Sequence, residues 1–461
     1  MPLTMKTIDL RLLLTLFFLF LLIYILVEPF FSSDPRIMAF YLLACALFAL
    51  MFHHTFKGKL FSFKDIGRFR AVFLAFLIIG TCAALVYTFH SSEVNQDGMR
   101  NVTMGETFLK YGDFKEYNST GTLVWSHRYS PMMPLYLSIF IGASGKDLYV
   151  LKAASFLIFL LCLYVVYACT KRLYNTDAGI MAAGLTAIIP RLWESTANLQ
   201  VESMALAVYV LIIFSIIKSL DKRTQYYIIY AGIFAGLGYL TRSSIGYFFI
   251  VAGVLGFLWR FYYMGWGTLK NRSYIIAIIC FLSFVAVWAT RNLYRFWNGT
   301  VGDLFISWQT DVHLSECSAI AFKDPLLLLL IIIIKFGWLV LLLVPWLYLS
   351  LNPLKEMRRL ISDERVSGLA IAIFIPLLLS MFIAAMFTIG EGYTTNPVLN
   401  FDNNRYMLIS TIPLLWYSIE AYDLAVGKRK ISRKVPPVPS PKGPSSSRTA
   451  RTTRPKHPKT V

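Results

Sequence analysis

The sequence is poor in charged residues, and this shortage decides the class of protein. Only 15% of the 461 residues are charged, whereas 57% are hydrophobic. Soluble domains usually carry roughly 25% charged residues. A chain of this composition cannot bury its apolar side chains inside one water-facing globule, so a single soluble domain is excluded. The bilayer must act as solvent for most of the chain, which predicts an integral membrane protein.

The cysteines and histidines lack the spacing of a disulfide framework or a metal site. Five of the six cysteines fall in apolar segments, and only Cys317 lies in an expected outer loop. The expected outer-face histidines, His90, His127 and His313, show no paired ligand spacing. We therefore predict no metal-binding residues, although the need for a divalent cation stays open.

The N-terminal apolar run lacks a cleavage site of small residues. Lys6 and Arg11 precede this run, which extends from Leu12 to Val27 and exceeds the apolar core of a signal peptide. We expect the run to remain as the first membrane anchor.

Long apolar runs are the main feature that the sequence does contain. A membrane helix needs about 20 mostly apolar residues. The segments that reach or approach this length are 10–28, 36–53, 70–89, 148–168, 177–190, 203–219, 225–241, 244–260, 274–290, 325–350, 368–389 and 405–425. We expect an all-α membrane protein of about twelve multi-pass transmembrane helices, with a further partial helix at 133–143.

Acidic residues are scarce relative to basic ones, and the basic ones are unevenly placed. The chain has 25 Asp and Glu against 44 Lys and Arg. The basic residues gather in short loops on one side of the apolar segments and in residues 428–461. This pattern indicates cytoplasmic loops next to anionic membrane lipids, and it argues against nucleic-acid binding. Both termini are then cytoplasmic, and the tail 428–461, which has no acidic or aromatic residue, is expected to be disordered.

The opposite, outer side holds the longer loops, which are 90–132, 191–202, 291–324 and 390–404. In the first of them, Met99, Val102, Met104 and Phe108 follow Asp97 at roughly helical spacing, with charged residues between them. This predicts an amphipathic helix on the membrane surface that ends at Gly112. Asp97 at its start suits two roles, a helix N-cap or a functional carboxylate.

Further outer-face motifs follow along the chain in a definite order. His127, Arg128 and Tyr129 precede Pro131 and a Pro134-Leu-Tyr segment. A glycine-rich span with Gly232, Gly236 and Gly238 ends in Leu-Thr-Arg at Arg242, and Arg405-Tyr406 opens the last span. In this order, and together with the acid-opened helix that closes at Gly112–Asp113, the motifs resemble the GT-C superfamily of membrane glycosyltransferases. The resemblance runs from about Leu74 to Asp423 and is nearest to protein O-mannosyltransferases and lipid A aminoarabinose transferases.

The resemblance implies a donor sugar on a polyprenyl phosphate, such as dolichyl phosphate, and transfer on the outer face. The acceptor would be a protein, a lipid or a glycan. The family's first-loop acid matches Asp97, and its second-loop acid matches Glu202. The neighbour of the first acid is often a second acid in relatives, whereas here it is Gly98. On this pattern residues 70–427 form the catalytic domain, and residues 1–69 add two helices and a basic loop.

Elementary chemistry suits the same assignment. A sugar on a lipid phosphate already has a good leaving group, so transfer needs a base within about 3 Å of the acceptor proton and cations for the departing phosphate. We expect Asp97 to be that base, with inversion at the anomeric carbon, and Glu202 to position the sugar or the acceptor. A single arginine at this depth is more often an interface anchor, but a group of them suits phosphate, which guanidinium binds in a two-pronged way. The expected substrate-binding residues are Arg100, Arg128, Tyr129, Arg242, Arg291, Lys335 and Arg405.

The alternative to an enzyme is a transporter or flippase for a polyprenyl-linked or other anionic substrate. Two features bear on this choice, Lys335 and the lack of an internal repeat. Lys335 lies about 15 Å into its span at 1.5 Å per residue, a depth at which an ionisable group marks function by default. It could equally snorkel or pair with a carboxylate. Transporters commonly show repeated halves that meet at the midplane, whereas the polar residues here gather in outer loops. An enzyme is therefore favoured, and the absence of a retention signal favours a prokaryotic plasma membrane.

Overall fold

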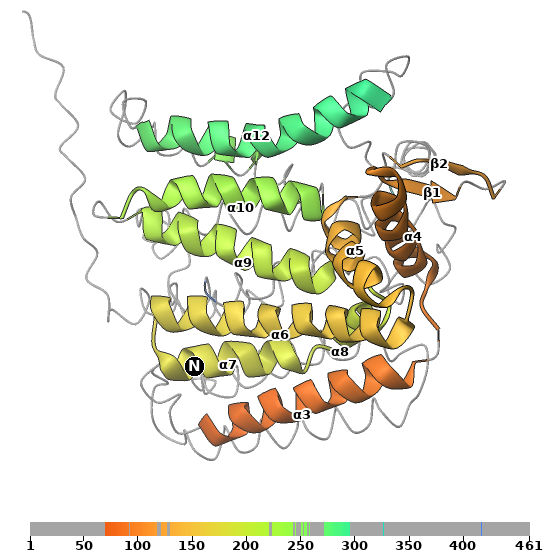
Figure 1. The fold of residues 1–461 in the computed structure, drawn as a ribbon. Coiled ribbons are helices and arrows are strands. Elements are labelled where there is room, and N and C mark those ends of the chain that lie inside the picture. Colours follow the sequence, from red (N-terminus) through yellow and green to blue (C-terminus); the bar gives the residue numbers. More distant parts are fainter. Residues whose placement is uncertain are drawn as a thin grey trace, which may run out of the picture.

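The computed structural model describes the middle of the chain (Figure 1). The described residues are 70–91, 93–117, 121–126, 130–220, 224–242 and 272–295, with Ile245, Ile250, Val251, 253–255, Leu258, Leu326 and Trp416. The first two predicted spans, the last three apart from Leu326 and Trp416, and the basic tail lie outside them. So do four predicted site residues: Arg128, Tyr129, Lys335 and Arg405.

Within the described part, four helices are long and apolar enough to cross a membrane. They are α3 (Arg70–His90), α6 (Leu148–Leu173), α9 (Glu202–Ser219) and α12 (Arg272–Arg295). Each begins within two residues of a predicted span, so these spans are confirmed as helices. The total of about twelve stays a prediction.

The described part also contains the helix α4 and four other shorter helices. They are α5 (Met132–Ser144), α7 (Thr176–Ala187), α8 (Pro190–Ala197) and α10 (Tyr227–Thr241). The predicted span 177–190 is wrong as a single helix, because α7 ends at Ala187 and α8 starts afresh at Pro190. Proline has no amide hydrogen and fits the first turn of a helix rather than its interior. As a result, the predicted outer loop 191–202 contains most of α8.

The helices pack side by side as a layer (Figure 1). Along it, α3 contacts α7, α7 contacts α6, α6 contacts α9, α9 contacts α10, and α10 contacts α12. The glycine-rich helix α10 packs closely on α12, since a Cβ on Gly232 would lie 2.2 Å from the carbonyl oxygen of Ala277. The outermost helices, α3 and α12, expose apolar side chains such as Ile78 and Val287, a surface that suits lipid.

The predicted surface helix is α4 (Gln96–Tyr111), which lies at one end of the layer together with α5 (Figure 1). Its N-cap is Asn95, whose side-chain oxygen accepts the amide of Gly98 at 2.9 Å, so the N-cap role considered for Asp97 is wrong. Gly112 ends the helix at φ 65°, as predicted, because glycine adopts the left-handed conformation without steric cost.

A short β-hairpin that the sequence did not predict follows α4. Its strands β1 (Lys115–Tyr117) and β2 (Leu123–Trp125) pair antiparallel, with Lys115 opposite Trp125. Lys115 places its ammonium over the rings of both Tyr111 and Trp125, at 4.1 Å from each ring centroid. Such contacts stabilise a cation on an aromatic face, and they attach the hairpin to the end of α4.

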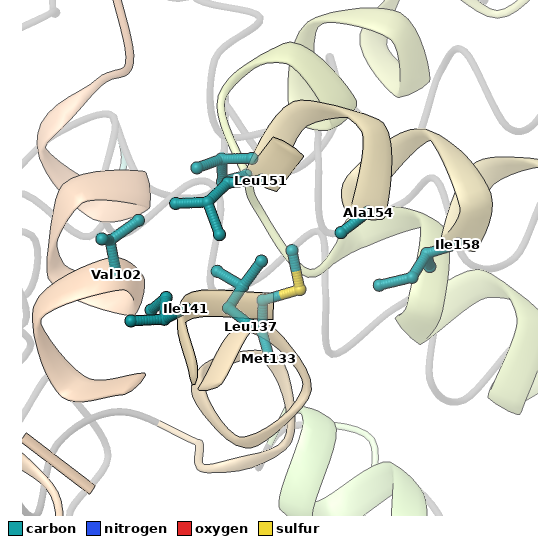
Figure 2. Close-up of a cluster of buried hydrophobic side chains, with 8 residues drawn as sticks. Val102, Met133, Leu137, Ile141, Leu151, Ala154 and Ile158 are labelled. Carbon is teal, nitrogen blue, oxygen red and sulfur yellow. The ribbon is translucent and has the colours of Figure 1, made fainter. Parts of the chain in front are cut away.

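A hydrophobic cluster attaches α4 and α5 to the layer of helices (Figure 2). Its members are Val102 of α4, Met133, Leu137 and Ile141 of α5, Leu151, Ala154 and Ile158 of α6, and Leu199 from the turn before α9. Burial of each large apolar side chain contributes about 1.5–3 kcal/mol. The cluster therefore holds the start of α4 against α5, α6 and the chain that leads into α9.

Candidate functional site

The first turn of α4, which carries Asp97, is docked on the turn between α8 and α9. Asn101 donates a side-chain hydrogen bond to the carbonyl oxygen of Leu199 at 2.9 Å. The backbone amide of Asn95 donates to the side-chain oxygen of Asn198 at 3.1 Å. Because Glu202 begins α9 directly after this turn, the structure brings the segments that carry the two predicted acids together.

Two local features show how tightly this contact is made. A Cβ on Gly98 would lie 1.9 Å from the carbonyl oxygen of Asn198, so no side chain fits at that position. This gives a physical reason for the glycine that follows Asp97. Leu199 on the other side has φ 54°, an uncommon conformation for a non-glycine residue. Strained residues of this kind persist only where their surroundings fix them, and they cluster at functional sites.

Asp97 itself is accessible. Its carboxylate accepts a hydrogen bond from Arg100 at 3.5 Å, and the two side chains are 34% and 33% exposed. A long ion pair at this exposure is weak. Asp97 can therefore exchange Arg100 for another hydrogen-bonding group, such as a substrate hydroxyl.

Glu202 and Arg242, two predicted site residues that lie forty positions apart, form a buried ion pair. Arg242 Nη1 donates to Glu202 Oε1 at 3.5 Å, and the side chains are 13% and 4% exposed. The backbone amide of Arg242 also closes α10 by donating to the carbonyl oxygen of Gly238 at 2.7 Å. A buried carboxylate needs a cation or donors to offset its lost hydration, and Arg242 supplies a cation beside one oxygen of Glu202.

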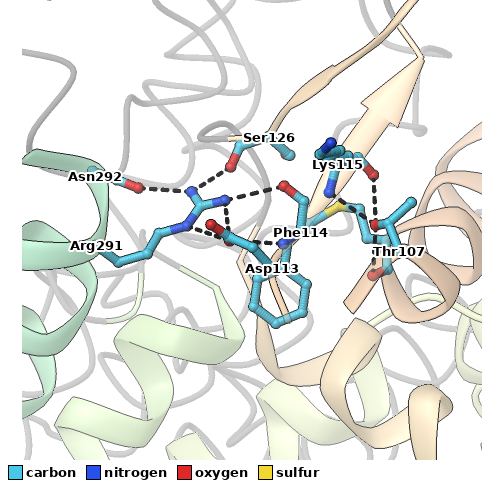
Figure 3. Close-up of polar contacts among 8 residues, drawn as sticks. Thr107, Asp113, Phe114, Lys115, Ser126, Arg291 and Asn292 are labelled. Atoms are coloured by element: carbon cyan, nitrogen blue, oxygen red, sulfur yellow. Dashed lines mark hydrogen bonds and ion pairs between the residues drawn. The ribbon is translucent and has the colours of Figure 1, made fainter. Parts of the chain in front are cut away.

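Arg291 is held in a different and more complete way (Figure 3). Its guanidinium makes an ion pair with Asp113 at 2.6 Å and donates to the backbone carbonyls of Phe114 and Ser126 and to the side chain of Asn292. Its plane also lies over the Trp288 ring, 4.7 Å from the centroid. The sequence singled out Arg291 and the Gly112–Asp113 helix end separately, and nothing in the sequence indicated that they meet.

Lys152 is a buried cation that the sequence analysis missed. It is 1% exposed and lies about one turn after the start of α6. Its ammonium donates to the backbone carbonyl of Ser91, in the segment that leads from α3 to α4. Within the described ranges no carboxylate forms an ion pair with it. The only sequence signal was one lysine near the start of an apolar span, a position typical of a snorkelling side chain.

The described residues contain no group of three or more His, Cys, Asp or Glu that could hold a metal ion. The acids and cations named above thus form pairs rather than a ligand cluster. Such pairs can accept a proton, bind an anion or fix a loop, and among these acids Asp97 has the most accessible carboxylate.

Comparison with known proteins gives a match at the level of a family. A family model described as dolichyl-phosphate-mannose-protein mannosyltransferase matches residues 128–289, which is 162 of the 461 residues. The matched range contains Glu202 and Arg242, whereas Arg291 lies two residues after it and Asp113 and Asp97 lie 15 and 31 residues before it. No curated protein and no solved structure matches the chain. The family match confirms the resemblance to the GT-C glycosyltransferases that the sequence motifs indicated, and together with the membrane-length helices it supports an integral membrane protein.

Proposed function

We propose that the protein transfers a sugar from a polyprenyl-phosphate donor to a hydroxyl of a protein, lipid or glycan acceptor on the outer face of the membrane. The observation that carries the proposal is the docking of α4 on the α8–α9 turn. It sets an accessible carboxylate, Asp97, beside the start of the helix that carries the buried Glu202–Arg242 pair. The family match supports a glycosyltransferase of this general kind.

In the proposed reaction, Asp97 accepts the proton of the acceptor hydroxyl. The hydroxyl oxygen then attacks the anomeric carbon from the face opposite the phosphate, and the bond between that carbon and the phosphate oxygen breaks. The products are the inverted glycoside and the polyprenyl phosphate. The reaction moves one negative charge from the Asp97 carboxylate to the departing phosphate. The ammonium or guanidinium groups near the site bind this phosphate, and the protonated Asp97 returns its proton to solvent.

The other predicted residues take supporting roles in this proposal. Glu202, fixed by Arg242, accepts hydrogen bonds from the donor sugar or the acceptor. Arg100 orients the Asp97 carboxylate through its 3.5 Å contact. The phosphate contacts fall to Arg128, Tyr129 and Arg405, with Lys335 deeper in its span.

The test measures transfer from radiolabelled polyprenyl-phosphate sugars by purified protein in detergent, with a panel of donor sugars. Asp97→Asn keeps the shape of the side chain but removes the base, and general-base catalysis typically contributes about 10²–10⁴-fold. We expect wild-type turnover with at least one donor, and a loss of about that size in Asp97→Asn with lipid binding retained.

Asp147→Asn is the matched control. Asp147 lies on the same outer side, and its oxygen caps α6 by accepting the Tyr149 amide at 2.8 Å. Asparagine caps helices equally well, so this variant should transfer sugar at the wild-type rate. Equal turnover in Asp97→Asn and the wild type would remove Asp97 from its role. Absence of turnover with every donor, combined with lipid movement across vesicles, would instead support the flippase alternative.

A further inference from the structure

All three guanidinium nitrogens of Arg291 are engaged by the protein itself. Arginine carries five N–H donors in a fixed fork. Nε donates to Asp113 Oδ1 at 2.8 Å, and Nη2 donates to the carbonyl oxygen of Phe114 at 3.0 Å and forms an ion pair with Asp113 Oδ1 at 2.6 Å. Nη1 donates to the carbonyl oxygen of Ser126 at 2.5 Å and to Asn292 Oδ1 at 2.8 Å. A phosphate could bind this guanidinium only by displacing acceptors that already occupy each of its nitrogens.

Two of the acceptors lie at the two ends of the β1–β2 hairpin. Phe114 directly precedes β1, and Ser126 directly follows β2. The two residues also pair with each other, since the amide of Ser126 donates to the carbonyl oxygen of Phe114 at 3.0 Å. Arg291 thus joins the closed base of the hairpin to α12, across 165 and more positions of sequence (Figure 3).

The charges and the packing fit a permanent contact. The Asp113 side chain is 6% exposed, so its carboxylate depends on Arg291 for compensation. Phe114 stacks on Phe108 of α4, with ring centroids 4.9 Å apart, and lies 5.9 Å from the Trp288 ring of α12. Aromatic contacts therefore connect the hairpin base to both helices beside the ion pair.

We propose that Arg291 is a positioning residue and not a phosphate ligand. With Asp113 it clamps the base of the hairpin onto α12, and this fixes the point at which the chain leaves Ser126 for His127, Arg128 and Tyr129. The proposed function assigns Arg128 and Tyr129 to the donor phosphate, so the catalytic consequence of the clamp rests on that proposed function. The clamp itself rests only on the contacts of Arg291.

The experiment follows backbone hydrogen exchange of residues 112–126 in the full-length protein, for wild type, Arg291→Lys and Asp113→Asn. Lysine keeps the charge, but a compact ammonium cannot reproduce the guanidinium fork. Asparagine keeps the volume of Asp113 while removing its charge. We expect exchange in the hairpin to rise about tenfold or more in both variants, with the amides of α6 unchanged. Arg70→Lys is the matched control, because Arg70 pairs with Asp177 at 3.8 Å near the opposite end of α3 and should leave hairpin exchange unaltered.

Binding of radiolabelled dolichyl phosphate and transfer rates separate positioning from direct contact. If Arg291 positions the loop, Asp113→Asn and Arg291→Lys should each lower transfer, and the double variant should be no worse than the poorer single one, since both remove one contact. If Arg291 binds phosphate, Asp113→Asn would free the guanidinium and tighten dolichyl phosphate binding while hairpin exchange stays at the wild-type rate. That result would overturn the inference.

The transfer and exchange measurements also distinguish an error in the proposed function from an error in the clamp. A wild-type protein without transfer from any donor would remove the transferase, yet faster hairpin exchange in both variants would still establish the clamp. Unchanged hairpin exchange in both variants would overturn the clamp whatever the transfer rates are.

Discussion

The substitution Gly98→Ala tests the contact that joins the two predicted acids. The added Cβ would lie 1.9 Å from the carbonyl oxygen of Asn198 and 2.5 Å from Cγ1 of Val94, whereas real Cβ contacts below 3.0 Å essentially never occur. The carbonyl is backbone and cannot rotate away. The first turn of α4 must therefore move by about 1.1 Å, the difference between 3.0 Å and 1.9 Å.

The size of the effect follows from this displacement. Forcing a methyl group into a packed contact costs about 1–3 kcal/mol, and stretching the bond from Asn101 to the Leu199 carbonyl adds to that cost. The better helix propensity of alanine offsets about 1 kcal/mol. The net loss of stability is then modest, but a misplacement of about 1 Å at a reacting group can lower the rate about 10²-fold. We expect transfer to fall far more than stability.

The assay compares sugar transfer and thermal unfolding of Gly98→Ala with those of Gly142→Ala. Gly142 lies on the neighbouring helix α5, and a Cβ there would meet only Leu109, at an ordinary 3.7 Å. The control should match the wild type in both measurements. Our account of the α4 contact would be refuted if Gly98→Ala transferred sugar within about threefold of wild type, because a shift of about 1 Å should cost much more.

Three further substitutions test other parts of the structure. Lys152→Met removes a buried cation that has no carboxylate partner among the described residues; we expect unchanged or higher thermal stability, and a fall of several degrees would contradict this. Gly232→Val places a side chain against the backbone of Ala277, 2.2 Å from the new Cβ, and should lower the unfolding temperature by separating α10 from α12; an unchanged temperature would be inconsistent with that contact. The ammonium of Lys146 lowers the pKa of Glu106 through a side-chain hydrogen bond. The pair therefore stabilises the fold at pH values above the unfolded-state pKa of about 4.3. This stabilisation is lost as the pH falls through the lower folded-state pKa. Lys146→Met should therefore be less stable than wild type at pH 6, by less than about 1 kcal/mol, with the difference vanishing at acid pH; a difference that persists at acid pH would argue against the ion pair.

The positions of helices could largely be predicted because each depends on a local pattern. Apolar runs with the length of a bilayer crossing placed α6 and α12, and a glycine after the amphipathic run placed the end of α4 at Gly112. The errors are also local in origin. The segment 177–190 is apolar except for Asp177 and Thr186, so hydropathy alone could not show that the helix ends before Pro190. Asn95 and Asp97 both suit an N-cap, and only the backbone conformation selected Asn95.

The sequence by itself determined that this is a helical membrane protein whose motifs resemble those of the GT-C glycosyltransferases, because composition and the order of motifs can be read without knowledge of distances. It also named Asp97, Glu202, Arg242 and Arg291 as residues of interest. Only the tertiary structure decided how these residues are partnered. Ion pairs form between groups far apart along the chain, and their partners depend on how helices pack against one another. That packing pairs Glu202 with Arg242 and leaves Asp97 accessible. It also brings Arg291 to Asp113 and the base of the hairpin, which the residues around Arg291 in the sequence do not indicate.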